Sequence, residues 1–313
     1  MCRLILILTE EMGVRRALAA VLMIAFAGAC GSGGGADDQS RGRIQVVASF
    51  YPLFEAAQRV GGDLVQVRNL TPAGSEPHDL ELSSRQVDQI EDAAVVLFLG
   101  QGFQPALEKA ADRAKGMKID MLGELENVLP APAGDDQLDV DPHVWLDPRL
   151  FKAIVTRVAD ALSTADPGNR ATYEANAAAY GRELDDLDAA FVRGLSACER
   201  RVVVTSHAAL GYLTARYGLR QEAIAGLEPE SEPSPQRLAD LAARVRAEGT
   251  TTVFYETLVS PKVAQSLARE AGVSTAVLDP IEGLSDDDAR AGKTYVSAMR
   301  ENLAAVRRAL GCR

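Results

Sequence analysis

Short aliphatic segments alternate regularly with amphipathic ones from Ile44 to the C-terminus, and this alternation limits the folds open to the chain. Each aliphatic segment is bounded by Gly, Asp or Pro, a pattern that predicts buried β-strands. The predicted strands are residues 44–48, 65–70, 95–99, 117–121, 201–205, 222–225, 251–255 and 275–278. Strands that alternate with helices favour an α/β fold with a mainly parallel sheet and helices on both faces.

Helical periodicity fills the segments between these strands. Ser83 and Ser84 stand where a helix N-cap is expected, and Asp147 with Pro148 forms a second start signal, with Asp as the cap and Pro at the first helical position. The predicted helices are residues 53–60, 85–93, 105–114, 148–166, 208–217, 235–248, 261–271 and 293–310. The acidic, proline-bearing segment 129–140 has no periodicity and is predicted to be a loop.

One longer helix, over residues 170–195, interrupts the alternation. Its apolar or small side chains recur every three or four residues, which indicates one buried stripe: Tyr173, Ala177, Tyr180, Leu184, Leu187 and Phe191. A chain of 313 residues also exceeds what one compact core usually holds. We therefore predict an N-terminal α/β lobe (residues 44–167), a connecting helix (168–197) and a C-terminal α/β lobe (198–313).

The first 29 residues have the organisation of a signal peptide. Arg15 and Arg16 precede an apolar run, residues 17–29, that is too short to cross a bilayer of roughly 30 Å, and Met12 is an alternative start of translation. The run ends in Ala-Gly-Ala-Cys, which leaves two interpretations of Cys30: the lipid-modified first residue of a lipoprotein, or merely the residue after a cleavage site. The tetrad departs from a lipobox at Ala27, where a larger aliphatic residue is usual.

The segment 30–43 is rich in Gly, Ser and Asp and is predicted to be a flexible tether. A tether suits a domain held at a membrane by a lipid, and a freely secreted domain does not need one. We therefore favour lipid attachment at Cys30 and a location outside the cytoplasm, on the outer face of the cell membrane.

Apart from Cys2 and Cys30, the chain contains only Cys198 and Cys312. An exported protein occupies a compartment that tolerates disulfides, so these two residues can pair, although two free thiols are the alternative. We predict that Cys198 and Cys312 form a disulfide.

The net charge of −11 argues against nucleic acid as a partner, since a phosphate-binding surface needs clustered Lys and Arg.

The chain has only three histidines, and all of them fall in predicted loops or at a strand end: His78, His143 and His207. A single histidine near a turn is usually structural, but here no histidine is used anywhere else. Imidazole is a common zinc ligand. Because the three residues are far apart in sequence, and no H-E-x-x-H or C-x-x-C occurs, they can share a metal only through the tertiary fold, in the cleft between the lobes.

Several motifs together resemble those of the zinc and manganese solute-binding lipoproteins of bacterial ABC importers, the metal-binding cluster A-I family. They are Pro-His-Asp at 77–79, Asp-Pro-His-Val-Trp-Leu-Asp-Pro at 141–148, Thr-Ser-His at 205–207, Glu-Pro-Ser-Pro at 232–235, Tyr-Glu-Thr-Leu at 255–258 and Leu-Asp-Pro-Ile-Glu at 278–282. The resemblance extends from about Ile44 to the C-terminus. It implies two similar lobes, a rigid connecting helix, a metal buried between the lobes, and delivery of that metal by a monomer to an ABC permease and its ATPase.

The resemblance also implies a set of ligands. His78, His143 and His207 match the three imidazole positions of the family, and the fourth position is a carboxylate of the second lobe or water. Glu282 matches this position best. Asp279, which can instead cap its turn, and Glu76 are the competing candidates. Glu256, at a strand end, is expected to orient a ligand or to hold a loop rather than to bind the metal.

Zn²⁺ is the expected ion, and Mn²⁺ is the alternative. Manganese-binding members tend to have a carboxylate where this chain has His207, and nitrogen-rich coordination favours zinc. The loop 129–140 contains Asp135, Asp136 and Asp139 but lacks the histidines that many zinc-binding members carry there.

A zinc hydrolase could use the same three imidazoles. Glu282 would displace the water that hydrolysis needs, so we predict a protein that is not an enzyme.

Overall fold

The computed structural model describes residues 42–126, 128–133, 138–231 and 233–313. The predictions for the signal peptide, for Cys30 and for the tether up to residue 41 lie outside the described residues. The first lobe contains a parallel sheet of β1 (Ile44–Ala48), β2 (Val65–Asn69), β3 (Val95–Phe98) and β4 (Met117–Asp120), in the order β2-β1-β3-β4. Val46 is in register with Val67 on one side and Val95 on the other.

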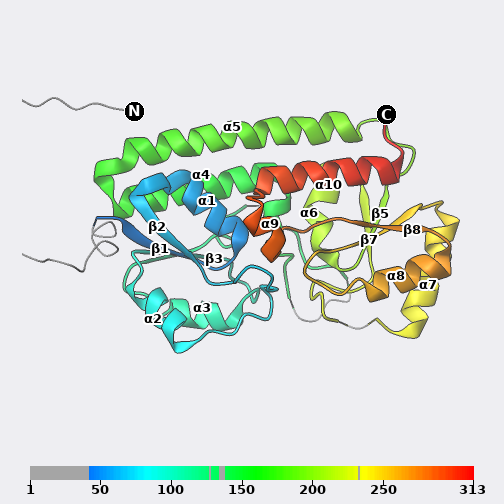
Figure 1. Cartoon of the computed structure of the whole chain (residues 1–313), viewed down its shortest axis with the longest axis horizontal. Coiled ribbons are helices and arrows are strands. Elements are labelled where there is room, and N and C mark those ends of the chain that lie inside the picture. The colour runs from blue at the N-terminus through cyan, green and yellow to red at the C-terminus, as the bar shows by residue number, and fades with distance from the viewer. Residues whose placement is uncertain (1–41, 127, 134–137, 232) are drawn as a thin grey trace, which may run out of the picture. The chain divides into compact units, whose positions relative to one another are not determined.

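Helices cover both faces of this sheet, as the alternation predicted. α1 (Tyr51–Gly61) and α4 (Pro148–Ala165) lie on one face, and α2 (Ser84–Asp92) and α3 (Pro105–Ala111) lie on the other (Figure 1). Ser83 caps α2 in a capping box, and the carboxylate of Asp147 accepts from the backbone N–H of Arg149 at 2.8 Å to cap α4. Both helices therefore begin where the cap residues predicted.

The second lobe repeats this arrangement with β5 (Val202–Thr205), β6 (Arg220–Ala223), β7 (Thr252–Tyr255) and β8 (Ser274–Val277), in the parallel order β6-β5-β7-β8. α7 (Pro235–Ala247) and α8 (Lys262–Ala271) cover one face of the sheet. α6 (Gly211–Arg216) and α10 (Tyr295–Leu310) pack on the other. The two lobes therefore share one strand topology.

One local prediction was inaccurate, and one short helix was missed. Residues 222–225 were predicted as a strand, but β6 begins at Arg220, because Gly218 turns the chain at φ 65° and the N–H of Arg220 already donates to the carbonyl of Arg201 at 2.8 Å. The short helix α9 (Asp286–Arg290) was not predicted. It buries no side chain, so it has no apolar stripe that the sequence could display.

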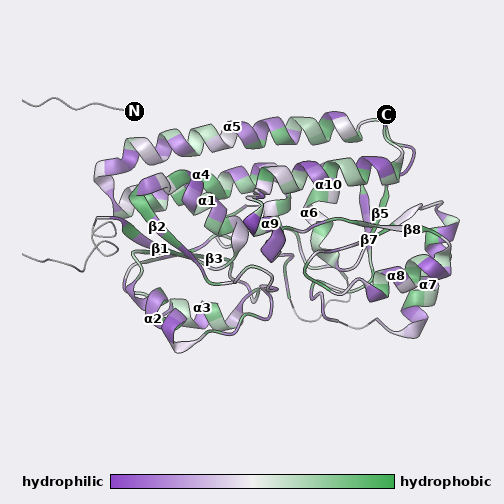
Figure 2. Cartoon of the chain, in the orientation of Figure 1, coloured by the Kyte–Doolittle hydropathy of each residue, from purple (hydrophilic) through white to green (hydrophobic). Residues whose placement is uncertain are grey.

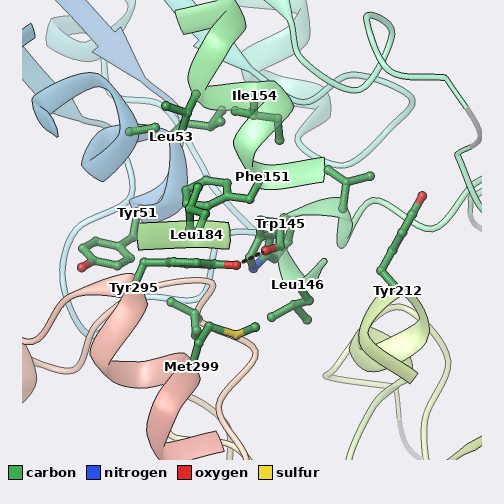
Figure 3. Close-up of a cluster of buried hydrophobic side chains, with 14 of the residues drawn as sticks. Tyr51, Leu53, Trp145, Leu146, Phe151, Ile154, Leu184, Tyr212, Tyr295 and Met299 are labelled. Carbon is green, nitrogen blue, oxygen red and sulfur yellow. Dashed lines mark hydrogen bonds between the residues drawn. The ribbon is translucent and has the colours of Figure 1, made fainter. Parts of the chain in front are cut away.

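α5 (Arg170–Leu195) joins the lobes (Figure 1), and hydrophobic and hydrophilic residues both occur along its length (Figure 2). The largest apolar cluster is continuous across the two lobes and includes Phe151 of α4, Leu184 of α5 and Met299 of α10 (Figure 3). This shared core supports a stiff connection between the lobes. None of the helices in the described part of the chain is both long and apolar enough to cross a membrane.

The predicted disulfide between Cys198 and Cys312 is confirmed. Cys198 follows the end of α5, and Cys312 follows the end of α10, 114 residues further along the chain. The bridge therefore ties the start of the second lobe to the C-terminal segment.

Candidate metal centre

The three histidines and Glu282 all lie in connections outside the strands. His78 lies between β2 and α2, and its N–H donates to the carboxylate of Glu76 at 2.9 Å. His143 immediately precedes the 3₁₀ turn η2 (Val144–Leu146). His207 stands between β5 and the turn η4 (Ala208–Leu210), and Glu282 follows β8. His207 and Glu282 thus follow the carboxyl ends of strands, where open α/β sheets bind their ligands.

The structure brings these four side chains together. One potential ligand atom of each, on His78, His143, His207 and Glu282, lies within 4.8 Å of the others. A carboxylate oxygen of Glu282 is 3.1 Å from Nε2 of His143, 3.3 Å from Nε2 of His207 and 3.7 Å from Nε2 of His78. His78 is 6% exposed and the other three are 1% exposed or less, so the cluster is closed to bulk water.

Each imidazole places its other ring nitrogen, Nδ1, against a carboxylate. A carboxylate can only accept a hydrogen bond, so Nδ1 carries a proton, which makes Nε2 the nitrogen that a metal would bind. Carboxylate–imidazole pairs of this kind orient metal-binding histidines and make them more basic. The pairs are His143 with Asp141 at 2.8 Å, His207 with Glu256 at 2.7 Å and His78 with Glu228 at 3.3 Å.

The charges of these groups shift one another's pKa values in the metal-free protein. Burial alone would lower the pKa of His78, but the carboxylates of Glu228, Glu282 and Glu76 outweigh it and raise the pKa to about 10. Burial also opposes the charged form of His207, and Glu256 and Glu282 raise its pKa despite this. The imidazoles hold the pKa of Glu282 well below its usual range, although burial acts in the opposite direction. The site is therefore built to keep a buried carboxylate ionised.

The competing candidates for the fourth position lie outside this cluster of four. Asp279 accepts from the N–H of Ile281 at 2.8 Å, which is the turn-capping role considered for it. A carboxylate oxygen of Glu76 lies 3.9 Å from Nε2 of His78, and burial together with the charge of Glu282 raises the pKa of Glu76 to about 8. Glu256 lies against His207, as expected of a residue that orients a ligand.

Asp141 and Glu228 were missed as histidine partners. Asp141 had a local signal, because it stands two residues before His143 and also accepts from the backbone N–H of His143 at 2.9 Å. Glu228 had none, since it reaches His78 from 150 residues away in the chain. A pairing of this kind is visible only after the lobes are assembled.

The donor set fits a zinc ion. Among the described residues, Nε2 of His78 is buried without a hydrogen-bond partner, which is costly unless the nitrogen binds something else. Three imidazole nitrogens and one carboxylate oxygen form a donor set that suits four-coordinate zinc. The geometry of the side chains and their chemistry therefore agree.

Comparison with known proteins identifies the family. The profile of the zinc-uptake complex component A, periplasmic (ZnuA), matches residues 46–309, nearly all of the described chain. The chain belongs to this family.

Individual ZnuA-family relatives match over most of this chain. The zinc-binding lipoprotein AdcA of Streptococcus pneumoniae is 36% identical over an alignment of 281 residues that covers 86% of this chain and 56% of AdcA. This chain thus spans only about half of that relative. The high-affinity zinc uptake system protein ZnuA of Bacillus subtilis is 32% identical over 93% of this chain and 95% of its own length.

A solved structure supports the same assignment. The Zn(II)-bound ZnuA-like domain of Streptococcus pneumoniae AdcA matches with a TM-score of 0.75 and 38% identity, over 86% of this chain and 99% of that domain. The fold of two parallel-sheet lobes joined by a long helix is therefore shared with a ZnuA-type protein.

Proposed function

We propose that this protein captures one Zn²⁺ ion outside the cytoplasm and delivers it to an ABC permease for import. The observation that carries the proposal is the convergence of His78, His143, His207 and Glu282, with their ligand atoms within 4.8 Å of one another. Two of these residues come from each lobe, so the ion is held where the lobes meet. This arrangement suits a cargo that is enclosed and later released.

Zinc is the proposed cargo rather than manganese because of the donor atoms. Manganese prefers oxygen ligands, whereas three of the four donors here are imidazole nitrogens. The carboxylates of Asp141, Glu228 and Glu256 behind the imidazoles add negative charge that a dication neutralises. The zinc-binding names of the AdcA relatives and the zinc-bound AdcA domain support the same ion.

We propose a binding protein rather than an enzyme. A catalytic zinc site needs an open coordination position for water or substrate. Glu282 would fill the fourth position here, because its carboxylate is 1% exposed and lies against two of the imidazoles. The zinc hydrolase that uses the same histidines is therefore the weaker candidate.

The remaining parts of the proposal concern where the protein acts. The signal peptide, the tether and lipid attachment at Cys30 would hold a monomeric domain at the outer face of the cell membrane. The permease and its ATPase would complete the importer. The description of the family as a periplasmic component of a zinc-uptake complex supports this setting.

Metal analysis tests the proposal directly. Protein purified without added metal, then dialysed against a limited mixture of Zn²⁺ and Mn²⁺, should contain one zinc per chain by mass spectrometry of the metals. Simultaneous substitution of His78 and His143 by Ala should abolish this zinc. Tighter binding of manganese, or zinc retained in the double variant, would contradict the proposed cargo or the proposed site.

A further inference from the structure

Ile281, the residue before Glu282, has a strained backbone. Its φ is 58°, in the left-handed region that β-branched residues rarely adopt, and its side chain is fully buried. Among the described non-glycine residues, only Gln101 shares a positive φ, and it lies exposed. A strained conformation persists only where the surroundings hold it in place, and such residues cluster at ligand sites.

Both ends of the peptide unit between Pro280 and Ile281 are held by side chains. The N–H of Ile281 donates to the carboxylate of Asp279 at 2.8 Å, and the carbonyl of Pro280 accepts from Nε1 of Trp145 at 2.7 Å. Asn302 in turn fixes the backbone of Asp279 through two hydrogen bonds, of 2.9 and 2.6 Å. The orientation of this peptide unit sets φ of Ile281. It therefore also sets the direction of the backbone that leads to Glu282.

Trp145 is the member of this group that comes from the first lobe. It is 1% exposed and lies two residues after His143, with the indole and imidazole ring centres 5.1 Å apart. Its own carbonyl accepts from the hydroxyl of Tyr295 at 2.5 Å (Figure 3). The indole N–H therefore connects the turn that carries His143 to the turn that carries Glu282.

We infer that Trp145 is a positioning residue for the metal ligand Glu282. Its N–H holds the Pro280 carbonyl in the orientation that keeps Ile281 left-handed and aims the Glu282 carboxylate at the imidazoles of His143 and His207. Without this hydrogen bond, Ile281 relaxes toward negative φ and the carboxylate moves away from the ion. The inference rests on the proposed zinc site and adds a residue to the control of that site.

A double-mutant cycle on zinc affinity tests the inference. Trp145→Phe keeps an aromatic ring but removes the N–H, and we expect the zinc Kd to rise about three- to tenfold. The same substitution in a Glu282→Gln background should change the Kd by less than about twofold, because the group through which Trp145 acts is already altered. Additive effects would overturn the inference. A parent protein that binds no zinc would instead overturn the proposed function.

Two further proteins separate positioning from packing. Tyr295→Phe removes the hydrogen bond to the Trp145 carbonyl and leaves the bond from the indole to Pro280, so it should leave the Kd within about twofold of the parent. A Tyr295→Phe protein that lost as much affinity as Trp145→Phe would overturn the inference.

Trp145 is the only tryptophan of the chain. Replacing tryptophan throughout the protein by benzothienylalanine therefore changes this one residue, and it exchanges only the indole N–H for sulfur. This protein should match Trp145→Phe in Kd, and parental affinity would contradict the role of the N–H.

Discussion

Nδ1 of His207 lies 2.7 Å from a carboxylate oxygen of Glu256, which stands at the end of a neighbouring parallel strand. The same oxygen accepts from the hydroxyl of Ser206. The carboxylate therefore both orients the imidazole and makes its Nε2 more basic toward a metal.

Glu256→Gln should weaken zinc binding about tenfold, at the lower end of what such partners contribute, because the amide can still accept a hydrogen bond but carries no charge. Ser206→Ala is the matched control, since it removes the other hydrogen bond to Glu256 and leaves the charge in place. Competition with a chromophoric chelator measures both values of Kd. Equal losses in the two variants would show that the charge of Glu256 is unimportant.

The four ligands should contribute unequally. His207→Ala should raise the zinc Kd more than Glu282→Ala, because without His207 the second lobe offers the ion only a carboxylate. Loss of Glu282 leaves all three imidazoles, and water can fill the vacant position, so we expect a loss on the order of tenfold, or about 1.4 kcal/mol.

Calorimetric or competitive titration of both variants at pH 7 checks this order. Equal losses would mean that the carboxylate matters as much as the imidazole. A Glu282→Ala protein with parental affinity would move the fourth ligand to Asp279, Glu76 or water.

Zinc affinity should fall as the pH is lowered. In the metal-free protein the neighbouring carboxylates raise the pKa of His78 to about 10 and also raise that of His207, so protons occupy these imidazoles at neutral pH. Zinc must displace these protons, and each step down in pH below the raised pKa makes the displacement harder.

The dependence should therefore continue above pH 6.5, the ordinary value for imidazole, and should not level off there. Titrations at pH 6, 7 and 8 measure the slope, and calorimetry in buffers of different ionisation enthalpy counts the protons released. A Kd that is constant between pH 7 and 8 would contradict the prediction.

The disulfide should stabilise the fold without tuning the metal site. Cys198 and Cys312 are 114 residues apart in the chain, and closing a loop of this length stabilises a protein by about 4–5 kcal/mol on the chain-entropy model. The double Cys→Ser variant should lose about this much free energy of unfolding in urea. Its zinc Kd should match the parent. Two free thiols in the unfolded, unreduced protein without Cys30 would show that the bridge does not form.

Glu55 should be a main source of stability where the lobes meet. Its buried carboxylate accepts from the hydroxyls of Tyr51 and Tyr180 and from the N–H of Tyr295, which come from α1, α5 and α10. Glu55→Ala leaves these donors without an acceptor and should cost about 3 kcal/mol of unfolding free energy. Tyr180→Phe removes one of the bonds and should cost about 1 kcal/mol. A Glu55→Ala protein as stable as Tyr180→Phe would contradict this role.

Local patterns were enough to predict most of the architecture. The strands predicted at 44–48 and 117–121 and the helix at 170–195 match β1, β4 and α5 to within a residue or so, because buried strands and amphipathic helices display their periods directly in the sequence. The secondary-structure predictions failed where the sequence shows no such period. The exposed α9 has no apolar stripe, and the start of β6 is decided by the chain reversal at Gly218.

Residue types alone limited which side chains could bind a metal, whereas the way these side chains meet depends on the folded chain. With three histidines in the chain, His78, His143 and His207 were the sole imidazole candidates. The motif at 278–282 favoured Glu282 over Asp279, but local periodicity does not explain that choice. The two carboxylates differ in what they contact. The Asp279 carboxylate accepts from the N–H of Ile281, whereas the left-handed backbone of Ile281 directs Glu282 toward imidazoles from both lobes. Contacts across so many residues depend on the assembled fold, which local periodicity does not encode.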